Sequence, residues 1–218
     1  MQAARRSVSI ALRSATFMTD SLPPVELAEP VELPPHGAAR SDAPRAPLPG
    51  RPTVRFMLSN PAHCIALGFG SGLPRIAPGT VGTLWAWVAF VVMQRWFVPS
   101  TIGWIILVSL PIGWWACTVT ARNLRIADPG AIVWDEVVAF WLVLWMIAPT
   151  GLLGQSIAFG LFRFFDAAKP GPVAWADSLF KQRDAAEPSW WAAGFGIILD
   201  DLVAAFCTLL VIAAWQAW

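Results

Sequence analysis

Tyrosine does not occur in this sequence, although tryptophan occurs 14 times among the 218 residues. Charged residues are also scarce: they make up 13% of the chain, about half of what is usual in soluble domains. Hydrophobic residues make up 56%, and the mean hydropathy is +0.57. Because tryptophan favours the boundary between membrane and water, this composition predicts an integral membrane protein in contact with a lipid bilayer.

Histidine and cysteine are too few for a metal centre built from imidazole or thiolate ligands. The two histidines are His36 and His63, and Cys64, Cys117 and Cys207 lie far apart in apolar sequence. These cysteines predict buried side chains rather than disulfides or a zinc site. The net charge is +1 and the basic residues are scattered, so no nucleic-acid partner is expected.

The first 52 residues differ from the rest, because they are rich in proline and alanine and show no helical period. They are predicted to form a disordered extension, residues 1–52, before a helical membrane domain, residues 53–218. The expected fold class is all-α, a polytopic membrane protein with about four or five apolar helices. Pro111 is expected to kink the second helix, and the charged end of the fourth suggests that it crosses the bilayer only in part. The predicted helices are 83–98, 101–120, 131–148, 151–169 and 189–218.

Two pairs of adjacent acids interrupt these apolar runs. Asp200 and Asp201 would lie about 100° apart on a helix, so they cannot both face lipid without a large cost. They could be salt-bridge partners that fix helix packing, but a functional role is the default for ionisable groups in such a run. Asp135 and Glu136 could merely complement a helix dipole in a first turn. The repetition of the pattern in two helices favours function for both pairs.

A third group is Arg163, Asp166 and Lys169, spaced three residues apart on a helix that Pro170 is expected to end. One interpretation is an ion-pair ladder within the helix. The other is a catalytic face, with Asp166 on a metal ion and the two cations on phosphate oxygens.

A glycine-rich segment, residues 68–84, could hold an anion with its backbone N–H groups. Its candidate substrate-binding residues are Ser71, Gly79 and Thr80, and Thr80 is also expected to cap the following helix. The segment is no P-loop, because the lysine and its spacing are absent. A simple tight turn explains the glycines equally well.

Hard oxygen ligands without histidine or cysteine favour Mg²⁺, and Mg²⁺ with arginine and lysine is typical of phosphoryl chemistry. In a membrane protein, this combination points to a lipid phosphate. The candidate metal-binding and catalytic residues are Asp135, Glu136, Asp166, Asp200 and Asp201.

At four stretches the sequence resembles the phosphatidylglycerophosphatase A family. They are SNPAHCIALGFGSGLPRIAPGTVGTL, IVWDEVVAFW, FRFFDAAKPGPVAWAD and GIILDD, and the resemblance runs from about Leu58 to the C-terminus. It implies a Mg²⁺-dependent phosphatase of the bacterial inner membrane that acts on phosphatidylglycerol phosphate. The product, phosphatidylglycerol, also feeds cardiolipin synthesis. By motif position, the five acids form the site, and Arg163 and Lys169 are the cations on the phosphate side.

Two mechanisms remain open, attack by metal-activated water and an aspartyl-phosphate intermediate, and clustered acids favour the first. A phosphatase with a histidine nucleophile is excluded, because no histidine follows His63. The alternative function is a transporter or channel subunit whose buried acids carry protons or cations. A third hypothesis is an assembly factor without enzymatic activity, in which the motifs serve helix packing.

The positive-inside rule predicts a site that faces the cytoplasm, because the basic residues and the motifs share the same loops. The sequence does not indicate an oligomeric state. The basic residues are Arg75, Arg122, Arg125, Lys169, Lys181 and Arg183.

Overall fold

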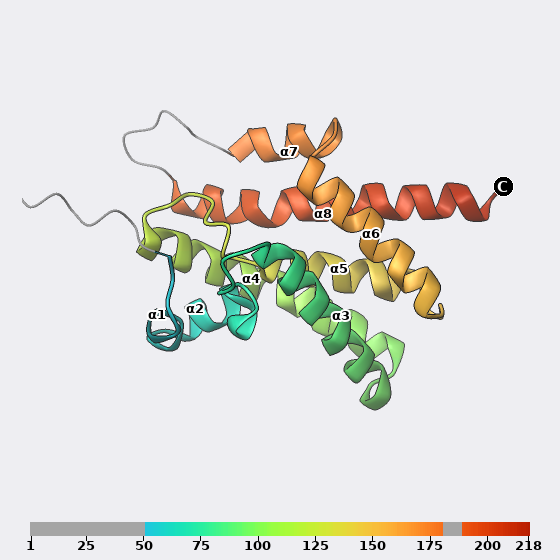
Figure 1. Cartoon of the computed structure of the whole chain (residues 1–218), viewed down its shortest axis with the longest axis horizontal. Helices are drawn as coiled ribbons and strands as arrows, with labels where there is room; N and C mark the ends of the chain where they lie inside the picture. The colour runs from blue at the N-terminus through green and yellow to red at the C-terminus, as the bar shows by residue number, and fades with distance from the viewer. Residues whose placement is uncertain (1–50, 181–188) are drawn as a thin grey trace, which may run out of the picture. The chain divides into compact units, whose positions relative to one another are not determined.

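Within residues 51–180 and 189–218, which the computed structural model describes, every regular element is helical (Figure 1). The all-α prediction is therefore confirmed. The predicted extension falls almost wholly outside the described residues, and the division at residue 52 stays a prediction. The helices are α1 (Val54–Leu58), α2 (Pro61–Ala66), the 3-10 helix η1 (Gly68–Gly70), α3 (Pro78–Trp96), α4 (Pro99–Leu124), α5 (Trp134–Met146), α6 (Leu152–Ala168), α7 (Pro172–Phe180) and α8 (Trp190–Gln216).

Proline sets the start of α3, which begins before the predicted range of 83–98. Pro78 occupies the first turn, where its fixed φ and missing N–H cause no loss. Ala77 takes the N-cap position with φ 46°, and no side chain caps the helix. The prediction that Thr80 caps this helix is therefore wrong, because Thr80 already lies inside it.

Helix α5 forms the centre of the core. It packs against α3, α4, α6 and α8, and Val137, Ala139, Phe140 and Val143 are fully buried. Its 13 residues correspond to a length of about 20 Å, less than a hydrocarbon core of about 30 Å. The third apolar run is thus a short core helix, too short to cross a bilayer by itself.

Among the described helices, α4 and α8 are long and apolar enough to cross a membrane. Large apolar side chains cover their outer faces, such as Trp104 and Leu107 on α4 and Phe206 and Leu210 on α8. Exposed apolar surface of this kind is typical of contact with lipid. Two such helices support membrane association, and four or five spans are not confirmed.

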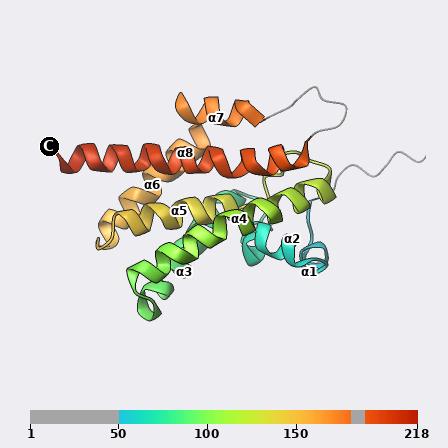
Figure 2. The same ribbon diagram turned by 180° about the vertical axis from the view of Figure 1, so that it is seen from behind.

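Small residues let α4 and α8 pack closely against each other in an antiparallel arrangement. A Cβ atom on Gly194 of α8 would lie 2.1 Å from the Thr118 hydroxyl oxygen of α4. The Trp114 indole N–H also donates a hydrogen bond of 2.9 Å to the Trp191 carbonyl. In Figures 1 and 2, α7 lies along α8 on one side and α5 on the other, in agreement with their contacts.

Candidate active site

The acidic pair of α5, Asp135 and Glu136, stands in the first turn of that helix. The segment before the helix is anchored by a hydrogen bond of 2.9 Å from the Val133 N–H to the Ala66 carbonyl of α2. Carboxylates in a first turn interact favourably with the positive end of the helix dipole. Asp135 and Glu136 therefore start from a position that tolerates negative charge.

Arg163 of α6 joins two of the acids. Its guanidinium donates a hydrogen bond of 3.1 Å to Glu136 Oε1 and also pairs with Asp166 one turn further along α6. Its side chain is only 19% exposed, so this bridge lies mostly out of water. The sequence spacing predicted the contact within α6, but it gave no sign of the contact with α5.

Three carboxylates from three helices meet here: Glu136 of α5, Asp166 of α6 and Asp201 of α8. One oxygen from each lies within 4.8 Å of the other two. The buried atoms Glu136 Oε2, Asp201 Oδ2 and Asp135 Oδ1 have no hydrogen-bond partner. Buried oxygens without partners are costly unless a cation or water satisfies them. The residues present therefore fit a hard divalent cation such as Mg²⁺.

The electrostatics of α5 agree with this fit. Burial raises the pKa of Glu136 to about 8, assisted by the nearby Asp166 charge and opposed by Arg163. Burial also raises the pKa of Asp135, and the charges of Glu136 and Asp200 add to the effect. A cation bound beside these two carboxyl groups would lower both pKa values and so favour their charged forms.

The two aspartates of α8 take different partners. Asp201 belongs to the three-carboxylate cluster. Asp200 instead pairs with the Lys169 ammonium and accepts a hydrogen bond of 3.1 Å from the Asp201 N–H. Lys169 is the C-cap of α6 with φ 43°, so it has left the helix. The predicted continuous stripe of three charges is therefore wrong at Lys169, which turns away toward α8.

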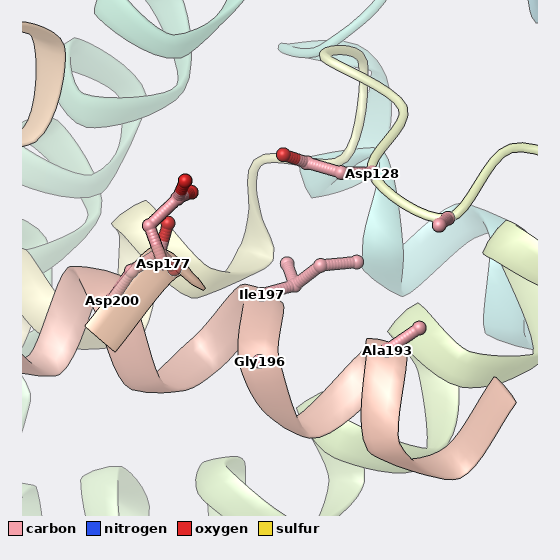
Figure 3. Close-up of a pocket in the computed structure, with 7 residues that line it drawn as sticks. Asp128, Asp177, Ala193, Gly196, Ile197 and Asp200 are labelled. Atoms are coloured by element: carbon pink, nitrogen blue, oxygen red, sulfur yellow. The ribbon is translucent and has the colours of Figure 1, made fainter. Parts of the chain in front are cut away.

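Asp177 of α7 is a second partner of Lys169, at 2.5 Å from Oδ1 to Nζ, and sequence reasoning missed it. Burial by itself would lower the pKa of Lys169, but hydrogen bonds to Asp177 and Asp200 outweigh it and raise this pKa. A signal was available, because Pro172 suits a helix start and Asp177 then shares a face with Val173. Figure 3 shows Asp177 and Asp200 at one side of a small cavity, with Asp128 on the loop opposite.

The glycine-rich segment reaches the acids at one of its three candidate positions. A Cβ on Gly79 would lie 2.0 Å from Glu136 Oε1, so α3 passes in direct contact with the acidic pair. The Ser71 hydroxyl donates to the Gly68 carbonyl at 2.8 Å and serves the loop itself. Thr80 is half-buried in the first turn of α3. Substrate binding by these residues stays a prediction.

A sequence model of the family described as Phosphatidylglycerophosphatase A matches residues 64–216, which include all the acids and both cations above. A curated Phosphatidylglycerophosphatase A of Haemophilus influenzae is 34% identical over 167 residues, covering 77% of this chain and 96% of that relative. One from Escherichia coli is 34% identical over 155 residues, covering 69% of this chain and 80% of that relative. No solved structure matches the chain.

Proposed function

The chain belongs to the phosphatidylglycerophosphatase A family, and we propose that it hydrolyses the terminal phosphate of phosphatidylglycerol phosphate to phosphatidylglycerol and inorganic phosphate. The observation that carries the proposal is the cluster of Glu136, Asp166 and Asp201 beside two cations, Arg163 and Lys169. Carboxylates that can hold a metal ion, next to donors suited to phosphate oxygens, are the parts that phosphoryl hydrolysis requires.

Mg²⁺ is the proposed cofactor. Glu136, Asp166 and Asp201 would hold it, with Asp135 and Asp200 beside them. When bound there, it would stabilise negative charge on the phosphoryl oxygens and lower the pKa of a water molecule. The buried oxygens that lack partners support this assignment.

The chain's own residues would orient the phosphate and neutralise it. Lys169 pairs with Asp200, the neighbour of Asp201 in α8, and would supply positive charge to a phosphate bound there. Arg163 limits repulsion between Glu136 and Asp166. In the reaction, water oxygen bonds to phosphorus, the ester P–O bond breaks and a proton passes to the leaving glycerol oxygen. We favour direct attack over an aspartyl-phosphate, because clustered acids suit metal binding.

We further propose a multi-pass protein of the bacterial inner membrane with the site toward the cytoplasm. Arg122 lies in the last turn of α4 and Arg125 follows as its C-cap, on the α4 end that meets the start of α8. Positively charged loops tend to remain in the cytoplasm. Beyond Asp201, α8 continues to Gln216 for about 22 Å, most of a hydrocarbon core of about 30 Å.

The alternative is a transporter or channel subunit with acids that carry protons or cations. Such a protein has no need of Arg163 paired with Glu136 and Asp166, or of Lys169 paired with Asp200. The ion pairs therefore favour the phosphatase, and an enzyme assay separates the two functions.

The test is phosphate release from phosphatidylglycerol phosphate in mixed micelles, by the full-length protein with Mg²⁺ and then with excess EDTA. We expect release that depends on Mg²⁺ and is lost in Asp200→Asn, with the variant still folded. Folded wild-type protein that releases no phosphate would refute the phosphatase and favour the transporter.

A further inference from the structure

The Lys169 ammonium lies between carboxylates from two different helices. Asp177 Oδ1 of α7 is 2.5 Å from Nζ, and Asp200 of α8 pairs with the same Nζ. The proposed chemistry uses Lys169 and Asp200 but gives Asp177 no role. Asp177 is a third charged group beside Lys169 and Asp200, and the fold of α7 does not require a carboxylate at this position. What Asp177 contributes to the site therefore needs its own explanation.

The turn after α6 explains how Asp177 arrives there. Lys169 and Gly171 both have positive φ, 43° and 44°, and α7 begins directly afterwards at Pro172. This turn folds α7 back along α8, where Val173 and Ala176 are completely buried. Asp177 follows Val173 by four residues and therefore shares its face toward α8.

Asp177 lines a small cavity together with Asp200 and Asp128 (Figure 3). Among the described residues, the three-carboxylate cluster is made by Glu136, Asp166 and Asp201, without Asp177. Asp177 is therefore paired with the ammonium group of Lys169 and is not one of the carboxylates that could hold a metal ion.

We propose that Asp177 is a positioning residue of the phosphatase site, which acts by holding the Lys169 ammonium against Asp200 at the edge of the carboxylate cluster. This inference rests on the proposed function. A lysine side chain has four rotatable bonds, and fixing its charge in advance avoids an ordering cost when the phosphate binds. Asp177 and Asp200 together fix it from two directions.

A double-mutant cycle on steady-state kinetics tests the proposal. Asp177→Asn should lower kcat/KM about tenfold, the size of effect expected when one charged hydrogen-bond partner of Lys169 is lost. Lys169→Met should lower it about 100-fold. The double variant should match Lys169→Met alone, because Asp177 acts only through the ammonium group. If the two losses multiply instead, or if Asp177→Asn equals wild type, the proposal is overturned.

Acylation of lysine gives a readout that does not depend on turnover. Lys169 and Lys181 are the lysines of the chain, so peptide mass spectrometry can follow both with Lys181 as reference. Asp177→Asn should make Lys169 react several-fold faster relative to Lys181, because one of its two partners is gone. An unchanged ratio would overturn the proposal.

Ser178→Ala is the matched control, because this neighbouring side chain is exposed and donates its hydrogen bond to the Trp175 carbonyl of the same helix. It should leave both readouts at the wild-type value. Wild-type protein that is folded but inactive would overturn the proposed function together with this inference. If the wild-type protein is active but the effects of Asp177→Asn and Lys169→Met on kcat/KM multiply, the inference alone is overturned.

Discussion

Two regions along helices α6 and α8 differ in character. The charged end is formed by the C-terminal end of α6 and the middle of α8, and the apolar end by the start of α6 and the C-terminal part of α8. At the charged end, which comprises the acids, Arg163, Lys169 and Asp177, the side chains pair with one another and α7 packs against α8. At the apolar end, α6 and α8 leave a cavity of about 500 Å³. Its lining includes Ile147, Ile157, Leu161, Val211, Ile212 and Trp215.

The difference follows from what each end must do. Charged groups act on a phosphate only when their positions are fixed, which requires close backbone contacts and paired charges. Apolar side chains in a bilayer need only to be compatible with lipid, so loose packing costs little there. Substitutions at the charged end should therefore change activity strongly, and those at the apolar end should not.

The largest effect is expected from Asp201→Asn. It removes one of the three clustered carboxylates, and kcat/KM should fall about 10²- to 10³-fold. The thermal midpoint measured in EDTA should stay or rise, because Asp201 Oδ2 is buried without a partner. Leu210→Ala, at an exposed apolar position of the same helix, should retain wild-type activity. Similar losses in both variants would contradict the division into two ends.

Arg163→Met should cost both activity and stability. It leaves Glu136 and Asp166 close together without their shared cation, and the free energy of unfolding should fall by about 3 kcal/mol. Chemical unfolding in detergent with EDTA measures this loss, and Arg163→Lys should recover part of it. A variant as stable as wild type would show that the bridge contributes nothing to the fold.

The sequence predicted the helices best where apolar runs are long, because a long apolar run indicates a buried or membrane-embedded helix whatever elements pack against it. It missed α7, because this helix has only nine residues and follows directly after a turn. It placed the start of α3 too late, because Thr80 resembles a helix cap, whereas Pro78 occupies the first turn.

The candidate site shows the same limit. Adjacent acids in apolar sequence pointed to Asp200 and Asp201, but spacing along one helix cannot say that they face different partners. That outcome depends on how α6 and α7 cross α8, which places Lys169 and Asp177 on one side and Asp166 on the other. Contacts between helices are tertiary, and no local pattern encodes them.

Binding of Mg²⁺ alone should stabilise the protein. At a free concentration 100 times the dissociation constant, the gain is about 2.7 kcal/mol, provided that the unfolded chain does not bind the ion. A thermal shift titrated with Mg²⁺ in the absence of lipid measures it, and Asp201→Asn should abolish the shift. A shift that persists in this variant would place the ion elsewhere in the protein.

The smallest effects come from two glycines that differ in their surroundings. In Gly194→Ala the new methyl group would lie 2.1 Å from the Thr118 hydroxyl and 3.0 Å from the Thr118 Cα. Helices α4 and α8 must then separate, at a cost of about 1–3 kcal/mol. Gly160 of α6 is exposed and a Cβ there would meet nothing within 4 Å, so Gly160→Ala should stabilise by about 0.5–1 kcal/mol through its helix propensity. Unfolding in detergent should give these opposite signs, and equal signs would mean that the close crossing of α4 and α8 does not restrict residue 194.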